Sequence, residues 1–137
     1  DTGAPEDLIL ANRLILENET LNRNGGKVED SKVEGNVEIM KGTKVKNCVI
    51  RGPVSIAPSC VLENAYIGPF TSIGEGSTVR NAQIENSILM GNCNIHDLET
   101  ILDSSLIGWD AEVTQKNGYP KADTLYIGDD SLVQLSK

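Results

Sequence analysis

The sequence has few aromatic residues and a single histidine. Aromatic side chains make up 4% of its 137 residues, with one Trp, one Phe and three Tyr. An ordinary globular core draws much of its buried area from aromatic rings, so this core is expected to consist of branched aliphatic and small side chains. One imidazole also excludes a zinc site built from three histidines.

A basic surplus, long apolar runs and paired cysteines are lacking as well. The net charge of −8 disfavours nucleic acid or an anionic membrane as a partner, and no apolar run approaches transmembrane length. Cys48, Cys60 and Cys93 show no spacing typical of a disulfide or metal framework. We therefore expect free, buried thiols in a protein of a reducing compartment, the cytoplasm.

What the sequence has instead is a period of seventeen residues. Large aliphatic residues recur in steps of six, six and five, and a small residue stands two places before most of them. The predicted inward columns are Val33, Ile50, Ile67, Ile84 and Ile101; Ile39, Ile56, Ile73, Met90 and Ile107; and Val45, Leu62, Val79, His96 and Val113. This pattern predicts an all-β fold, a parallel hexapeptide-repeat solenoid with three short strands per coil.

Residues that tolerate left-handed backbone angles also recur every seventeen positions. They are Asn47, Asn64 and Asn81, and Gly74, Gly91 and Gly108. A triangular coil must turn sharply three times, so we expect these residues at its corners.

The repeat breaks in its fourth coil, where His96 stands at an aliphatic position. If one residue is dropped there, Cys93 becomes the small residue, Ile95 the inward one and Asp97 the corner residue. This slip places His96 outward near a corner, and we expect the pattern to recover before Ile101.

The first 24 residues differ from the repeats. Pro5, followed by two acidic residues, is a favourable helix start, and Leu8, Ala11, Leu14 and Ile15 form one apolar face at helical spacing. We therefore predict a linker helix within residues 1–24 and a solenoid domain over residues 25–137. A loop excursion is expected at 114–124, and Ser131 with Val133 would form a last partial coil that caps the solenoid.

Several segments carry a resemblance to a known family. The start Asp1-Thr-Gly, the helix entry Pro5-Glu-Asp-Leu, the stretch Tyr66-Ile-Gly-Pro-Phe-Thr-Ser-Ile-Gly and the Ile127-Gly-Asp-Asp tail resemble long-form glucose-1-phosphate thymidylyltransferases, which are sugar-1-phosphate nucleotidylyltransferases. The resemblance implies a left-handed β-helix behind a catalytic domain that makes nucleotide sugars with magnesium. It also matches Asp1 to an aspartate that helps to bind the metal.

The resemblance implies a structural and oligomerising role for this chain. The Gly-rich phosphate loop and the sugar-binding lysine segment of such enzymes are absent, so we expect no catalytic or cofactor-binding residue here and no activity of the chain alone. The implied partners are the protein's own N-terminal nucleotidyltransferase domain and further copies of the chain, packed as a trimer. Tyr66, Phe70 and Trp109 are predicted to point outward, and three such rings in a chain poor in aromatics suggest an interface.

A hexapeptide-repeat acyltransferase is the alternative, with acetyl-CoA as donor and a sugar or amino-sugar phosphate as acceptor. That chemistry needs a general base, usually a histidine. In the bifunctional uridylyltransferase–acetyltransferases a histidine stands three residues before the Tyr of a Tyr-Leu-Gly-like turn, where this sequence has Glu63. His96 remains as a candidate base and Asn117 with Lys121 as a candidate substrate clamp, although a surface histidine and a solvated loop explain them as well.

Overall fold

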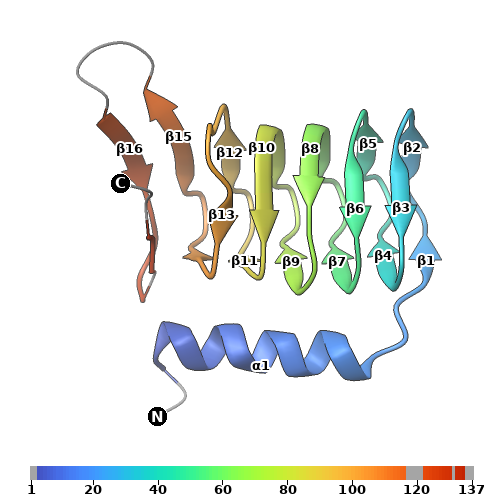
Figure 1. Ribbon diagram of the computed structural model, residues 1–137, viewed down its shortest axis with the longest axis horizontal. Helices are drawn as coiled ribbons and strands as arrows, with labels where there is room; N and C mark the ends of the chain where they lie inside the picture. Colours follow the sequence, from blue (N-terminus) through green and yellow to red (C-terminus); the bar gives the residue numbers. More distant parts are fainter. Residues whose placement is uncertain (1–2, 117–121, 131, 135–137) are drawn as a thin grey trace.

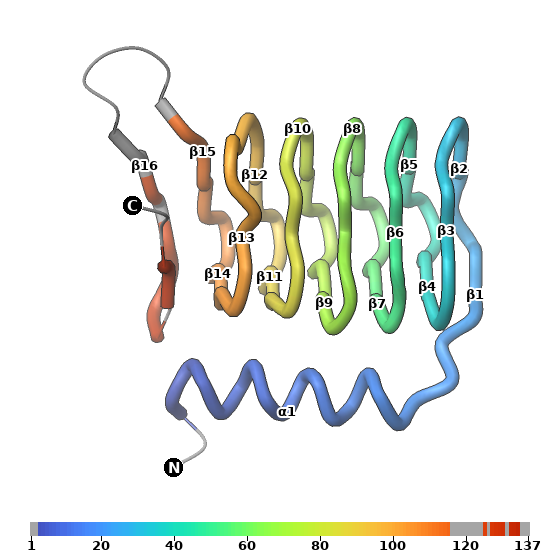
Figure 2. Tube along the Cα trace, in the orientation of Figure 1, coloured from blue at the N-terminus to red at the C-terminus, as the bar shows by residue number. Residues whose placement is uncertain are grey.

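The protein is a triangular β-solenoid with one helix along its side (Figure 1). The computed structural model describes residues 3–116, 122–130 and 132–134. Stacked coils run from β1 at one end of the prism to β16 at the other, and helix α1, Pro5–Asn18, lies beside them in the opposite direction (Figure 2). No helix in these described ranges is long and apolar enough to cross a membrane.

The strands form the three faces of the prism, named here by a residue or element that they carry. The helix face consists of β1 (Arg23–Asn24), β4 (Val37–Ile39), β7 (Val54–Ile56), β9 (Thr71–Ile73), β11 (Ile88–Leu89) and β14 (Leu106–Ile107). The lysine face consists of β2 (Lys27–Glu29), β5 (Lys44–Lys46), the first halves of β8 (Val61–Ile67) and β10 (Thr78–Glu85), β12 (Asn94–His96), β15 (Glu112–Lys116) and β16 (Ala122–Tyr126). The tyrosine face consists of β3 (Lys32–Glu34), β6 (Val49–Arg51), the second halves of β8 and β10, and β13 (Leu102–Asp103).

The predicted solenoid is confirmed by the strand register. Ile50 pairs with Ile67, and Ile67 with Ile84, in parallel strands of successive coils. All three side chains are 0% exposed. Each strand therefore offers one large aliphatic to a shared column, which fills the prism along its whole length. Small residues occupy the other inward slots, among them the free cysteines Cys48, Cys60 and Cys93, which are buried as predicted.

The slip in the fourth coil is confirmed, but it starts earlier and ends later than predicted. Ile95 is inward and pairs with Val79, sixteen residues before it. Met90, predicted inward, is 41% exposed, and Leu89 takes its place in register with Ile73. The spacing between inward residues on the helix face is therefore sixteen here, from Ile73 to Leu89, in place of seventeen.

The recovery before Ile101 was also wrong. Ile101 is 42% exposed, and Leu102, 4% exposed, fills the column eighteen residues after Ile84. The original phase returns at Ile107. Val33 does pair with Ile50 as predicted, yet it is 41% exposed because it belongs to the first coil, which no further coil covers on its tyrosine face.

The two kinds of residue predicted at the corners, asparagine and glycine, differ in their backbone angles. Asn47, Asn64 and Asn81 have left-handed φ angles of 54°, 50° and 52°. Gly74, Gly91 and Gly108 also lie at corners, in the turns that follow β9, β11 and β14, but none of them has the positive φ that was expected. Close approach requires glycine there instead: a Cβ at Gly91, for example, would collide with the ring of Trp109.

Helix α1 docks on the helix face with a side that the sequence did not indicate. Leu16 is buried at 3% exposure, and Ile9 is half-buried. Asn12 lies on the same side and makes hydrogen bonds to β9 and the turn before it. The apolar face predicted from the sequence, which consists of Leu8, Ala11, Leu14 and Ile15, does not dock on the solenoid and is exposed. Hydrogen bonds of Asn12 to the solenoid hold the helix in this rotation.

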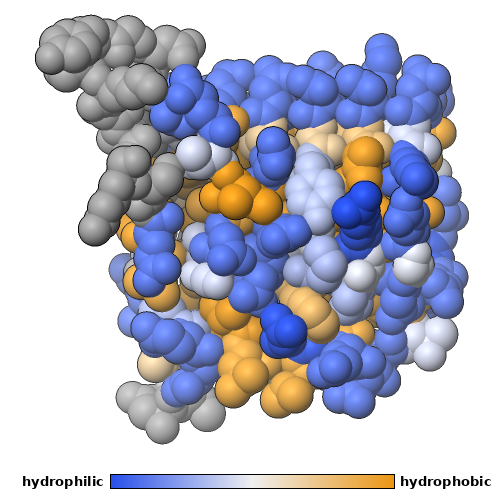
Figure 3. Space-filling model, in the orientation of Figure 1, coloured by the Kyte–Doolittle hydropathy of each residue, from blue (hydrophilic) through white to orange (hydrophobic). Residues whose placement is uncertain are grey.

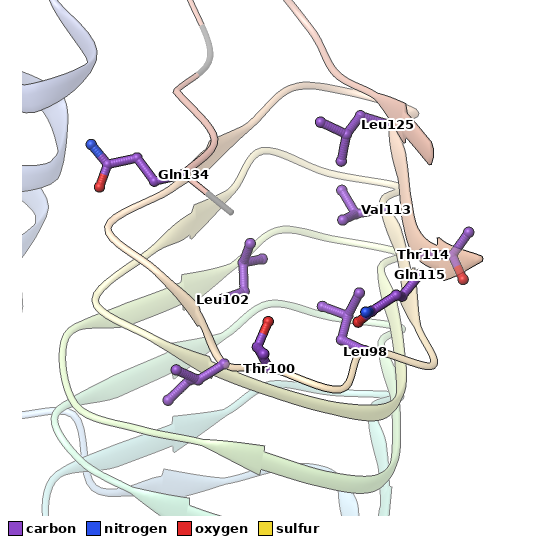
Figure 4. Close-up of a pocket in the computed structure, with 9 residues that line it drawn as sticks. Leu98, Thr100, Leu102, Val113, Thr114, Gln115, Leu125 and Gln134 are labelled. Carbon is purple, nitrogen blue, oxygen red and sulfur yellow. The ribbon is translucent and has the colours of Figure 1, made fainter. Parts of the chain in front are cut away.

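The chain closes the far end of the prism with a hairpin. Strand β16 pairs antiparallel with β15, so much of the predicted loop at 114–124 is strand; residues 117–121 lie outside the described residues. Leu98, Leu102, Val113 and Leu125 point into the prism end around a hollow of about 20 Å³ (Figure 4). That volume suits one water at most, so this end is an apolar cap. Val133 packs on it as predicted, whereas Ser131 lies outside the described residues.

The boundary between linker and solenoid falls slightly before the predicted one. The helix ends at Asn18, and β1 at Arg23–Asn24 already pairs with β4. The first strand of the solenoid therefore lies inside the range predicted as linker.

Candidate functional site

The tyrosine face carries a row of side chains that satisfy one another. The Tyr66 hydroxyl donates a 2.6 Å hydrogen bond to Oε2 of Glu85 in the next coil. The Arg51 guanidinium lies 6.0 Å from the Tyr66 ring centroid, and its Nε is 3.8 Å from Oε2 of Glu34. Burial, helped by the Glu85 carboxylate, raises the pKa of Tyr66. Tyr66 is therefore neutral, and its hydroxyl links one coil to the next through Glu85.

The corner between the lysine and tyrosine faces carries a ladder of amide side chains. Asn47 Nδ2 donates to Asn64 Oδ1 at 3.2 Å, Asn64 to Asn81 at 2.7 Å, and Asn81 to Asp97 Oδ1 at 2.8 Å. The ladder ends at Asp97 because the slip brings this residue, with φ of 57°, to the corner. We call this edge the asparagine corner.

His96, the only imidazole, lies between two carboxylates beside that corner. Its Nδ1 is 2.7 Å from Oδ2 of Asp97, and its Nε2 is 2.8 Å from Oε2 of Glu112 in the next coil. Thr114 Oγ1 is also 3.3 Å from Nδ1. The hydrogen bond to Asp97, and then that to Glu112, raises the pKa of His96, while the same contact with His96 lowers the pKa of Asp97.

This arrangement is unsuited to general-base catalysis. Each ring nitrogen must carry a proton to donate to a carboxylate, so the favoured state is the imidazolium. A general base needs a free lone pair aimed at the substrate. The outward placement of His96 agrees with the prediction, and its two carboxylate partners make it a link between coils.

Two open hollows lie on the surface, one lined mainly by amide groups and the other by charged and aliphatic side chains. One of about 390 Å³ runs along the asparagine corner between Asn64, Asn81 and Tyr66. Another of about 240 Å³ lies on the lysine face around Lys44, Lys46 and Glu63. Glu63, at the position where the acyltransferase pattern has histidine, is an exposed carboxylate on that face.

The first coils of the solenoid concentrate positive charge on an acidic protein, and Lys27, Lys44 and Lys46 of these coils lie on the lysine face. Residues 23–51 contain seven Lys or Arg and four Asp or Glu, although the whole chain has 12 and 20. Within the described part of the chain, Lys41, Lys44 and Lys46 form no salt bridge. On the lysine face of the first coils, Lys27, Lys44 and Lys46 outnumber the carboxylates Glu29 and Glu63, which flank Lys46 in the strand register. This part of the face therefore has a small surplus of positive charge.

The three aromatic residues predicted to form an interface lie in three different places. Tyr66 is half-buried on the tyrosine face. Phe70 lies at the corner between the tyrosine and helix faces, the phenylalanine corner, where the Arg13 guanidinium of α1 lies 3.9 Å from its ring centroid. Trp109 is 61% exposed at the corner between the helix and lysine faces, which we call the tryptophan corner.

The remaining predicted residues cannot be placed. Asp1, the metal-binding residue implied by resemblance, and Asn117 with Lys121, the possible clamp, lie outside the described residues. Among the residues that the structure describes, no three His, Cys, Asp or Glu side chains are arranged to hold a metal ion.

Sequence reasoning missed two residues that organise the surface. Glu112 follows His96 by sixteen residues, and the shortened repeat could have indicated that the two are neighbours. Asn12 fixes the rotation of α1, and the sequence signal for it was a short polar side chain between the aliphatic residues Ile9 and Leu16 of the docked side.

The comparison with protein families agrees with this architecture. Residues 50–122, just over half of the chain, match the model of the GMPPB C-terminal domain. The chain belongs to this family: it is the C-terminal β-solenoid domain of a nucleotidyltransferase-like protein.

A curated relative extends the similarity to nearly the whole chain. It is the low-salt glycan biosynthesis nucleotidyltransferase Agl11 of Haloferax volcanii, 41% identical over 138 residues. The alignment covers 98% of this chain but only 38% of the relative. The matched part includes both the helix and the solenoid.

Proposed function

We propose that this chain is the C-terminal module of a sugar-1-phosphate nucleotidylyltransferase of the glucose-1-phosphate thymidylyltransferase type. The 41% identity to a glycan biosynthesis nucleotidyltransferase over nearly the whole chain carries this proposal. The module acts by structure: a rigid prism sets how copies of the protein, and the catalytic domain joined to it, are arranged. The assembly proposed is a trimer.

The chemistry of the surface supports a structural role over a catalytic one. His96 has both nitrogens engaged by carboxylates, and Tyr66 donates its hydroxyl to Glu85. The interior is filled by aliphatic columns and by small residues. The exposed aliphatic residues of α1 and the exposed Trp109, by contrast, are typical of a contact surface.

Two assays test the proposal. With thymidine triphosphate and glucose-1-phosphate, and with acetyl-CoA and glucosamine-1-phosphate, this chain should give only background turnover. The longer protein that contains it should catalyse the first reaction. If the chain transferred acetyl groups and His96→Ala abolished that activity, the result would contradict the proposal and favour the acyltransferase. A longer protein that does not transfer nucleotides would also contradict the proposal.

A further inference from the structure

The outer side of α1 is apolar and uncovered. Leu8, Leu10, Leu14 and Ile15 are 36%, 55%, 51% and 60% exposed, and Figure 3 shows hydrophobic side chains gathered where Figure 1 draws the helix. A helix with aliphatic side chains on both its docked and its outer side is normally buried on both. Removing these side chains from water is favourable, so the surface is suited to a partner.

The helix cannot roll to bury this side on its own prism. Ser72 Oγ donates a 2.6 Å hydrogen bond to Asn12 Oδ1, and Asn12 Nδ2 donates to the Phe70 carbonyl oxygen at 3.2 Å. Arg13 covers the Phe70 ring beside them. These contacts hold the docked side against β9, so the outer aliphatics stay outward.

The apolar surface continues onto the tryptophan corner. A helix turns about 100° per residue, which puts Leu8 and Ile15 on the flank opposite Arg13. Because Arg13 reaches the phenylalanine corner, that opposite flank faces the tryptophan corner. There Met90 and Trp109 are 41% and 61% exposed.

The lysine face beyond that corner has the complementary charge. Helix α1 carries Glu6, Asp7 and Glu17 against one Arg13, and Glu19 follows it. Its C-terminal end lies beside the first coils (Figure 2). Lys44 and Lys46 belong to these coils, and neither forms a salt bridge with a residue that the structure describes. Val61 is the register partner of Lys44 on the neighbouring strand, and its half-buried side chain also points outward from the lysine face. The charge complementarity is confined to this end of the prism.

In a cyclic trimer the contacts are head-to-tail, so each copy needs two different surfaces that are complementary to each other. The outer side of α1 and the lysine face are two such surfaces. We infer that the outer side of α1 packs on the lysine face of the next copy, with the three tryptophan corners around the three-fold axis. Three triangular corners of about 60° fill half of the angle around an axis, and helices about 10 Å across fit the gaps between them. This inference rests on the trimer proposed above and assigns its surfaces.

Engineered cysteines test the assignment directly. In the double variant Leu14→Cys/Val61→Cys, each copy should form a disulfide with the next, and mild oxidation should give covalent trimers on a non-reducing gel. The natural cysteines are buried and do not compete. Each single variant should remain uncrosslinked, because Leu14 of one copy faces Val61 and not Leu14.

The outcomes separate the assignment from its alternatives. Dimers from Leu14→Cys alone would overturn it in favour of a symmetric helix-to-helix contact. A native trimer whose double variant stays uncrosslinked would overturn the assignment and leave the proposed function intact. A monomeric native chain would overturn the trimer and the assignment together, while the nucleotidyl-transfer assay would still decide the enzyme class.

A matched pair of charge variants provides a second measurement. Leu14→Glu should raise the concentration at which the trimer half-dissociates at least tenfold. Val49→Glu puts the same change on the tyrosine face and should leave that concentration within about twofold. The reverse result would place the interface on the tyrosine face. Circular dichroism of each variant shows whether the solenoid has formed.

Discussion

Ser72 Oγ donates a 2.6 Å hydrogen bond to Asn12 Oδ1 across sixty residues of sequence. This contact joins the N-terminal helix to the third coil of the prism and sets which side of the helix faces outward. The surface chemistry of the protein depends on it, because the exposed aliphatics of α1 follow from its rotation.

Loss of this contact should loosen the helix without unfolding the solenoid. A net hydrogen bond contributes about 1 kcal/mol, and Asn12 makes two. Asn12→Ala should therefore increase amide hydrogen exchange in α1 by roughly tenfold to thirtyfold and leave exchange in the buried strands unchanged. Asn18→Ala is the control, since the hydrogen bond that its side chain makes among the described residues stays within the helix, to the Leu14 carbonyl oxygen. Equal exchange in the two variants would contradict the role of Asn12.

Neighbouring residues test the register of the slipped coil. Leu89→Ala and Leu102→Ala remove fully buried side chains and should each lower the free energy of unfolding by about 2–5 kcal/mol. Met90→Ala and Ile101→Ala change residues that are 41% and 42% exposed, and should each lower it by about 1 kcal/mol or less. Urea denaturation measures all four. If Met90→Ala or Ile101→Ala lowered the free energy of unfolding more than Leu89→Ala or Leu102→Ala, the result would contradict the slip and favour an uninterrupted seventeen-residue repeat.

The His96 cluster should make stability depend on pH. Its folded-state pKa is raised, so its contribution is complete below the unfolded value of 6.5 and is lost as pH rises through the folded value. The pKa of Asp97 is lowered from 3.8, so the contribution of Asp97 is lost as pH falls through its folded value. The thermal midpoint should therefore fall from pH 6 to pH 8 more in the native chain than in His96→Gln. An NMR titration in which His96 titrates at or below 6.5 would contradict this account.

Trp109 is the only tryptophan, so its fluorescence reports on the tryptophan corner. In the proposed trimer its ring lies near the three-fold axis, although it is 61% exposed in a single copy. Acrylamide should quench the assembled native protein several-fold less than the Leu14→Glu variant at equal concentration. Equal quenching in a sample shown to be trimeric would place the axis elsewhere.

The fold could be predicted because each coil repeats one physical requirement. Ile50, Ile67 and Ile84 fill the same column, and the left-handed corner residues Asn47, Asn64 and Asn81 recur with them. Met90 and Ile101 were misplaced because each has an aliphatic neighbour, Leu89 or Leu102, and a sequence does not show which of two adjacent aliphatics turns inward.

The surface could be predicted less well, because it depends on contacts between coils and with the helix. A helix starting near Pro5 was expected and is present. The apolar stripe predicted for it is not the side that docks on the solenoid, because a helix with aliphatic residues on several sides leaves its docked side undetermined. Tyr66, Phe70 and Trp109 do lie outside the prism. Their separation onto one face and two corners follows from the coil geometry.

The mass of the native chain in solution tests the central claim most directly. The account holds that this 14.7 kDa solenoid is an assembly module. Light scattering coupled to size exclusion, at micromolar concentration and after tenfold dilution, should give three times that mass. A mass of 14.7 kDa at both concentrations would contradict the claim and show that the outer side of α1 is not a contact between copies.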